Sequence, residues 1–298
     1  MTPLVLVFGS AAADLVFRLP HLPRAGETVL GEAGPMLPGG KGANQALAAA
    51  RGGQGVAIAF AGAVGADPAA EVVTAPLRVA GVDLTRLRVV DRPTGLAAVC
   101  VDAQGANQIA VSTGANALAR ADQVGDADLG PGTVLLLQME VPAAENAALI
   151  LRARARGARV VMNLAPAAPM EVAALRALDL LVVNEPEAAW LGAGLGCHPD
   201  AAALHRALGI DVVVTLAERG AVAATRQGVV TASPFVVTPV DTVGAGDCWC
   251  GVLAAGLAAG MPLAPAMARA NAAAAIACTR QGAGTAMPTA AEIAAMLA

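Results

Sequence analysis

Short, unbroken runs of apolar residues recur along the chain, and longer alanine-rich segments separate them. Six runs have the composition and length of strands: residues 4–8, 56–61, 134–137, 160–162, 180–183 and 212–216. A strand that is covered on both faces is apolar at nearly every position, and strands that alternate with helices usually pair in parallel. The pattern therefore predicts an α/β fold with a mostly parallel central sheet and helices on both of its faces.

Two segments depart from this pattern. Residues 14–38 are rich in Pro and Gly and have alternating apolar positions, and residues 94–111 are typical of a hairpin with its turn near 102–105. Together they predict a small β-sheet. Open α/β sheets bind ligands at the carboxyl ends of their strands, so a small sheet there would act as a lid that excludes water. We expect one domain over residues 1–298 with these two lid segments inserted.

Helix boundaries are also readable. Asp67 before Pro68 fits an N-cap followed by proline at the first helical position, and Thr289 and Glu292 have the spacing of a capping box. The uncharged stretch 248–268 is long enough to span a bilayer, but it is interrupted by prolines and is rich in Ala and Gly. It therefore does not predict a membrane span.

Composition narrows the possible partners and compartments. The net charge is −4, and the densest basic set, Arg152, Arg154, Arg156 and Arg159, looks like the solvated end of a helix, so nucleic acid is not an expected partner. Residues 1–13 lack the basic start of a signal peptide and are better interpreted as a buried strand. The five cysteines are scattered, which argues against zinc and for a reducing compartment. We expect a cytoplasmic protein with no membrane partner.

The segment 241–247 is the most informative motif, because Asp241 and Asp247 bracket a turn of small residues that leads into an apolar run. Gly244 and Gly246 allow a tight turn, and its N–H groups can converge on a phosphate at a helix N-terminus. A carboxylate beside that phosphate, at Asp247, suits a proton acceptor for an attacking hydroxyl. The alternative is an N-capping aspartate after a glycine turn.

Lys41 is the only lysine of the chain and lies in the glycine-rich segment 39–46. The glycines allow a ligand to approach the backbone closely, and Asn44 offers both a donor and an acceptor. The spacing differs from that of a P-loop by one residue, and Gly42 replaces the Ser or Thr that would hold magnesium. The alternative is an exposed lysine in a strand-to-helix turn.

Further polar residues follow predicted strands. Asp14 and Glu140 could accept paired hydrogen bonds from sugar hydroxyls, or could cap helices. Asn184 and Glu187 could hold a magnesium ion and its waters, or could belong to a turn that starts a helix.

Taken together, these motifs resemble a known family. Segments 39–46, 184–187 and 241–247, with 137–140, 163–166, 215–220 and 271–282, resemble the signatures of the ribokinase-like (PfkB-type) carbohydrate kinases, in the same order and over nearly the whole chain. Within that family, this chain most resembles the ribokinases. The resemblance implies ATP-dependent phosphorylation of a sugar hydroxyl, with Asp247 as the base. The amides of Gly244, Ala245 and Gly246 would stabilise charge on the γ-phosphate.

The resemblance also implies further site residues. The sugar pocket would contain Ala12, Asp14, Gly40, Lys41, Gly42, Asn44, Glu140 and Asp247. ATP would lie along Asn184, Glu187, Thr215, Leu216, Ala217, Glu218, Arg219, Gly220, Gly246 and Asn271. Glu187 would act on Mg²⁺ through water, and a monovalent cation, K⁺, would lie at Asp241, Val243, Ala277, Arg280 and Gly282. The resemblance also implies a homodimer that forms through the lid.

Three positions depart from the ribokinase pattern: Ala12 stands for an asparagine, Ala217 for a glycine and Ala286 for a serine. The change at Ala12 removes a polar contact to the sugar and should weaken discrimination. Our leading hypothesis is a kinase that acts on a primary hydroxyl of a pentose such as ribose. A nucleoside or 2-deoxyribose kinase and a non-catalytic sugar-binding protein are the alternatives.

Overall fold

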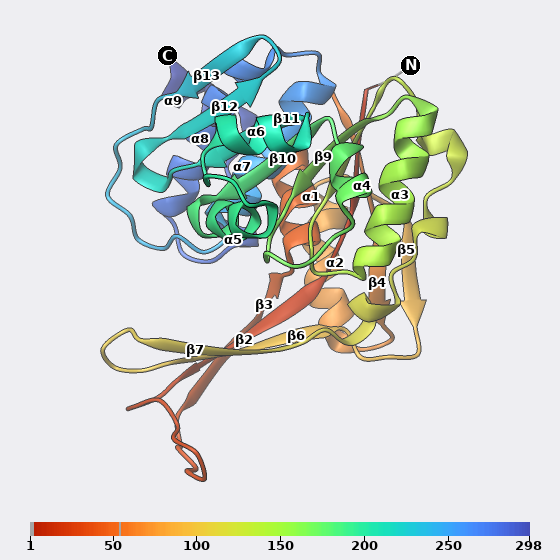
Figure 1. Ribbon diagram of the computed structural model, residues 1–298. Helices are drawn as coiled ribbons and strands as arrows, with labels where there is room; N and C mark the ends of the chain where they lie inside the picture. Colours follow the sequence, from red (N-terminus) through yellow and green to blue (C-terminus); the bar gives the residue numbers. More distant parts are fainter. Residues whose placement is uncertain (1–2, 54) are drawn as a thin grey trace.

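A nine-stranded sheet forms the centre of the computed structural model, which describes residues 3–53 and 55–298 (Figure 1). Its strand order is β13-β12-β11-β10-β9-β8-β1-β4-β5. The strands are β1 (Leu4–Phe8), β4 (Ala57–Gly65), β5 (Asp83–Val90), β8 (Thr133–Leu137), β9 (Arg159–Asn163), β10 (Leu180–Asn184), β11 (Asp211–Thr215), β12 (Ala221–Thr225) and β13 (Gly228–Ala232). All six predicted runs lie in this sheet, although β4 extends four residues beyond the predicted end at 61.

The sheet is parallel from β5 through β11, and only the edge pairs β11–β12 and β12–β13 are antiparallel. Parallel strands place their carboxyl ends at one edge, where an open α/β sheet binds its ligands. The residues that follow β1, β8, β9, β10 and β11 therefore meet at the same edge.

Helices cover both faces, as the apolar runs predicted. One face carries α1 (Lys41–Gly52), α2 (Pro68–Val79), α7 (Ala245–Ala258), α8 (Leu263–Cys278) and α9 (Ala290–Leu297). The other carries α3 (Ala143–Arg156), α4 (Val172–Arg176), α5 (Glu185–Leu195) and α6 (Ala201–Leu208). Each layer encloses its own apolar core, and the alanines of α1, α7 and α8 let these helices pack closely on one another.

A second sheet projects from the carboxyl edge of the first (Figure 1). Its order is β3-β2-β6-β7, from β2 (Ala12–Arg18), β3 (Glu32–Gly39), β6 (Gly95–Val101) and β7 (Asn107–Ser112). β6 and β7 form the predicted hairpin, in which the Gly105 amide donates to the Asp102 carbonyl at 3.0 Å. The predicted lid segments thus form one small sheet, but its strands begin at Ala12 and end at Ser112, slightly outside the predicted limits.

The helix signals were read correctly at two positions and wrongly at one. Asp67 caps α2 by accepting from the Ala70 amide at 3.0 Å, and Thr289 and Glu292 form the capping box of α9. The basic set does not lie on one helix end, because α3 stops at Arg156, Gly157 turns the chain at φ 83° and Arg159 begins β9. The stretch 248–268 is divided between α7 and α8. In the described part of the chain, no helix is long and apolar enough to cross a membrane.

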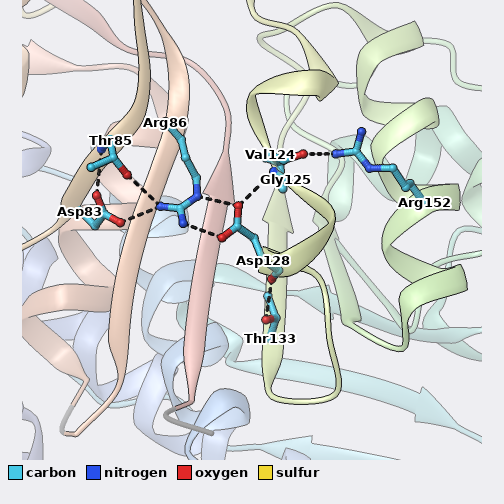
Figure 2. Close-up of polar contacts among 8 residues, drawn as sticks. All are labelled: Asp83, Thr85, Arg86, Val124, Gly125, Asp128, Thr133 and Arg152. Carbon is cyan, nitrogen blue, oxygen red and sulfur yellow. Dashed lines mark hydrogen bonds and ion pairs between the residues drawn. The ribbon is translucent and has the colours of Figure 1, made fainter.

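An ion-pair cluster fastens the edge strand β5 to the loop before β8 (Figure 2). The Arg86 guanidinium donates from Nε and Nη2 to the two oxygens of Asp128, at 2.9 and 2.5 Å, and from Nη1 to Asp83 at 2.6 Å. Asp128 also accepts from the Gly125 amide, and its carbonyl accepts from the Thr133 hydroxyl. This two-point geometry joins two segments 42 residues apart in sequence.

Candidate active site

A cavity of about 210 Å³ lies at the carboxyl edge of the central sheet. Several elements contribute to it: the start of α1, the ends of β9, β10 and β11, and the first turn of α7. Its lining residues are Lys41, Asn163, Ala165, Val182, Asn184, Glu187, Thr215, Gly244, Gly246, Asp247 and Cys250. Segments that the sequence separates by more than 200 residues thus meet at the predicted strand ends.

Asp247 lies in the first turn of α7, and Gly244 is the N-capping residue. The capping alternative for Asp247 is therefore wrong. Gly244 has φ 77°, and a Cβ there would come within 2.7 Å of the Ala283 side chain, so only glycine fits this turn. The amides of Ala245 and Gly246 belong to the first turn, where a helix offers N–H groups and positive potential to an anion.

The carboxylate of Asp247 is buried and receives two side-chain hydrogen bonds. The Asn44 amide donates to Oδ2 at 3.0 Å, and the Gln45 amide donates to Oδ1 at 3.0 Å. Burial raises the pKa of Asp247, while the Lys41 charge and these two donors lower it in part. A raised carboxyl pKa suits a proton acceptor that works near neutral pH.

Lys41 begins α1 and points its charge toward three acids. Burial alone would lower the pKa of Lys41, but the carboxylates of Asp247, Glu140 and Glu187 outweigh it and raise the pKa. Lys41 lines the cavity, so the alternative of a freely exposed lysine is wrong. Gly40, at φ 87°, and Gly42 are required by close packing, since a Cβ at either would lie 2.6 Å from the backbone nitrogen of Ala12 or Ser10.

Two further acids stand beside this lysine, and neither is the N-cap residue of a helix. Glu140 accepts from the Ser10 hydroxyl at 2.6 Å and from the Lys41 amide at 3.0 Å. Asp14 lies on β2, and burial, with Glu140 and Asp247 nearby, raises its pKa to about 6. Ala12 is buried between Gly39 and Gly95, its partners on the neighbouring strands of the lid.

Asn184 and Glu187 form the capping box of α5. The Glu187 amide donates to the Asn184 side chain, and the Asn184 amide donates to the Glu187 carboxylate, both at 2.8 Å. The segment therefore starts a helix, as the alternative interpretation held, and both side chains also line the cavity. Burial raises the pKa of Glu187. No cluster of three metal-ligating side chains occurs within residues 3–53 and 55–298.

The predicted nucleotide segment follows β11 as a short 3₁₀ turn, Ala217–Arg219. Ala217 has φ 49°, a left-handed conformation that favours glycine, which agrees with its place in the family pattern. Asn271 is buried, and its amide is engaged within the protein: Oδ1 accepts from the Trp249 indole, and Nδ2 donates to the carbonyls of Ala232 and Ser233. Its side chain anchors the segment after β13.

The predicted cation residues come from two adjacent segments. Asp241 accepts from the Val243 amide at 3.0 Å and from the Gly282 amide at 2.9 Å, and the Val240 amide donates to the Cys278 carbonyl. Ala277 lies in the last turn of α8, and the Arg280 side chain pairs with Glu292. Ala286 is buried close by in the 3₁₀ turn 284–286.

Sequence reasoning missed five residues with a polar side chain or a thiol at the site, Ser10, Gln45, Gln138, Asn163 and Cys250, and the apolar lining residues Ala165 and Val182. Ser10 holds Glu140, and Cys250 lines the cavity one turn after Asp247. Gln138 and Asn163 each come directly after a predicted strand, and this position was the signal that could have identified them. Gln45 carries no signal of its own, because it stands among alanines in α1.

Comparison with known proteins agrees with this geometry. A family model described as pfkB family carbohydrate kinase matches residues 2–290. Ribokinase from Haemophilus influenzae is 32% identical over 97% of this chain and 96% of its own length, and deoxyribokinase from Salmonella typhimurium is 32% identical over 84% of both. The structure of Arabidopsis thaliana ribokinase complexed with ribose and ATP superposes with a TM-score of 0.89 at 30% identity, covering 100% of this chain and 99% of that one.

The predicted fold class and family are thereby confirmed. The chain belongs to the pfkB family of carbohydrate kinases, enzymes that transfer a phosphoryl group from ATP to an alcohol group of a sugar.

Proposed function

We propose that this protein transfers the γ-phosphate of ATP to a primary hydroxyl of a pentose such as ribose, with Asp247 as the general base. One observation carries the proposal: a buried carboxylate lies in the first turn of α7, beside the amides of Ala245 and Gly246 and in the field of Lys41. A base for the acceptor hydroxyl and donors for the phosphate thus stand next to each other.

In the proposed reaction, the acceptor hydroxyl gives its proton to Asp247 as its oxygen bonds to the γ-phosphorus. The bond from the γ-phosphorus to the bridging oxygen breaks, and ADP leaves with that electron pair. The amides of Gly244, Ala245 and Gly246 would stabilise the oxygens of the transferred group. Asp14, Asn44 and Glu140 would fix the sugar, and Lys41 would lie between the sugar and the phosphate.

The nucleotide would extend from Asn184 along the segment 215–220 toward Ala232 and Ser233, which Asn271 anchors. Mg²⁺, held by Glu187 through water, would neutralise charge on the phosphates. K⁺ at the carbonyls around Asp241 and Gly282 would order the turn before α7, to which Asp241 is already bonded. These assignments rest on the matched motifs and on the contacts described above.

A second acceptor class is favoured by Ala12. The side chain there is a methyl group between two glycines, so this part of the pocket offers no hydrogen bond to a sugar hydroxyl. A 2-deoxyribose, or a nucleoside with its bulkier base, would lose less at this position than ribose does. The similarity to a deoxyribokinase also supports this class.

A panel of ribose, 2-deoxyribose, hexoses and nucleosides, assayed with ATP, Mg²⁺ and K⁺, separates the acceptor classes. We expect pentoses to give the highest kcat/KM. A nucleoside that is turned over far faster than any free sugar would contradict the pentose assignment.

Asp247→Asn tests the mechanism. We expect kcat to fall by about 10²–10⁴-fold, the range that general-base catalysis contributes, while sugar binding measured by calorimetry changes little. The matched control is Asp122→Asn, an exposed carboxylate paired with Arg88, which should keep full activity.

The two remaining outcomes are informative. An Asp247→Asn variant with near-full turnover shows that another group accepts the proton. Wild-type protein that binds sugar but turns over no member of the panel supports the third hypothesis, a non-catalytic sugar-binding protein.

We also propose a homodimer through the lid. Ile109 and Val111 on β7 are 58% and 66% exposed, and β7 is an edge strand of the small sheet. Exposed apolar residues on an unpaired edge favour association with a second copy.

A further inference from the structure

Gln45 lies fully buried at the centre of a hydrogen-bond network that ends on Asp247. Its Nε2 donates to Asp247 Oδ1 at 3.0 Å and to Asn163 Oδ1 at 3.1 Å. Its Oε1 accepts from Gln138 Nε2 at 2.7 Å. One side chain on α1 therefore connects the first turn of α7 with the ends of β8 and β9.

The direction of every bond in this network follows from the charge on Asp247. An ionised carboxylate only accepts hydrogen bonds, so Gln45 must turn its NH₂ group toward it, and its oxygen must then face Gln138. Gln138 must in turn donate. In this orientation Gln138 Oε1 has no hydrogen-bond partner in the described part of the chain, which costs free energy. The opposite orientation of the Gln138 amide would place two oxygens in contact instead.

The backbone around the network is shaped to hold it. A Cβ on Gly9 would lie 1.9 Å from Gln138 Oε1, so the residue that follows β1 must be glycine for Gln138 to occupy its place. The Gln138 carbonyl accepts from the Asn146 side chain at 2.7 Å, which fixes the backbone from the α3 side. Gln45 is thus held in part by Gln138, a neighbour that does not line the cavity.

We propose that Gln45 is a positioning residue for phosphoryl transfer, which keeps the Asp247 carboxylate ionised and aimed at the acceptor hydroxyl. The inference rests on the proposed role of Asp247 as the base. Asn44 supplies the donor to the other oxygen and also belongs to the proposed sugar pocket, whereas Gln45 acts only through Asp247 and the network behind it.

The charges that face Asp247 set the background for a pH test. They come from Lys41 on α1, Asp14 on β2, Glu140 after β8 and Glu187 on α5. The thiols of Cys248 and Cys250 on α7 itself are also titratable, but burial raises the pKa of each. None of these is altered by a substitution at position 45. A shift in the acid limb of the rate profile therefore reports on the hydrogen bond from Gln45.

The test compares Gln45→Met, which removes the donor at similar volume, with Gln45→Glu, which places a second carboxyl against Asp247. We expect kcat at pH 7 to fall at least ~10-fold in Gln45→Met with KM for the sugar nearly unchanged, and its acid limb to move up by about one pH unit. Gln45→Glu should move the acid limb of the rate profile to a still higher pH, because two adjacent carboxyls share one proton.

Gln123→Met is the control for the loss of a partly buried amide, since Gln123 bonds the carbonyls of Gly62 and Arg86 away from the cavity. It should lower thermal stability without moving the profile. If both position-45 variants lose stability but keep the wild-type pH profile and kcat, Gln45 is only structural. If Asp247→Asn itself stays active, the proposed base is wrong, and the two failures are thus distinguishable.

Discussion

At the scale of single residues, the ionised carboxylate of Asp14 destabilises the folded protein when no ligand is bound. Its carboxylate is largely removed from water and stands near Glu140 and Asp247, which raises its pKa to about 6 from 3.8. A group whose pKa rises on folding binds protons more tightly in the folded state. Stability therefore falls as the pH rises from about 4 to about 6, and the full cost remains above that window.

Asp14→Asn should relieve this cost. We expect the ligand-free variant to gain about 1–3 kcal/mol in free energy of unfolding at pH 8 and to gain little at pH 4, because a shift of one pKa unit corresponds to 1.36 kcal/mol. Sugar affinity should fall, since the amide accepts fewer hydrogen bonds. Urea denaturation at both pH values, with calorimetric sugar titrations, measures the two effects, and an equal change at pH 4 and pH 8 would contradict the assigned pKa.

Residue chemistry alone could identify Asp247, Lys41 and Glu187, because acids and a single lysine stand out in an alanine-rich chain. It could not identify Gln45 or Ser10. Their roles depend on distances to residues 93 to 202 positions away, such as Gln138, Glu140 and Asp247, and only the folded topology supplies those distances.

At the scale of elements, β5 is an edge strand that depends on Arg86 and Asp128. The two side chains are 20% and 19% exposed, so their pair is screened less by water than a surface pair is. Hydrogen bonding to Arg86 lowers the pKa of Asp128. Because the pKa of Asp128 is lower in the folded protein than the unfolded value of 3.8, the ionised carboxylate stabilises the fold at pH values above 3.8. This stabilisation is lost as the pH falls through the pKa of the folded state.

Asp128→Asn should therefore destabilise the protein by about 1–3 kcal/mol at pH 7, and by less as the pH falls below 4. Thermal or urea unfolding monitored by circular dichroism measures the change. Asp122→Asn, at the exposed pair with Arg88, should cost less than ~0.5 kcal/mol. Equal losses in the two variants would mean that the Arg86 cluster does not hold the edge strand.

The strands β1, β4 and β8–β11 were predictable, whereas β12 and the two edge strands β5 and β13 were not. β1 and β8–β11 are buried on both faces, so their sequences are apolar at nearly every position. β5 and β13 are half exposed, and their mixture of polar and apolar residues resembles that of loops. Arg159 was assigned to the helix before it because a basic residue near a helix C-terminus and one at the start of a strand look alike in sequence.

At the scale of the whole molecule, the lid sheet brings the proposed dimer surface and the proposed sugar pocket onto one face. Asp14 lies opposite Ala97, which lies opposite Val111, and Val99 lies opposite Ile109. Residues directly opposite one another in a sheet share a face. A second copy that covers Ile109 and Val111 would therefore extend over the same face as Asp14.

The double substitution Ile109→Lys and Val111→Lys should convert the proposed dimer to a monomer in sedimentation velocity runs and raise KM for the sugar. Lysine at both positions introduces like charges that repel across a two-fold interface. Val229→Lys, on the distant edge strand β13, is the control for adding charge at an exposed valine. A wild-type protein that sediments as a monomer would rule out the proposed assembly.

The position of Lys41 also determines how the protein reacts with amine-selective reagents. It carries the only ε-amino group of the chain, and every other basic side chain apart from histidine is an arginine, which such reagents leave unmodified. The fraction of molecules acylated at Lys41 therefore measures the fraction whose cavity is accessible to the reagent. A bound sugar or nucleotide should protect this side chain from acylation. The chain thus contains its own active-site titration, readable as a single mass increment on the peptide that contains residue 41.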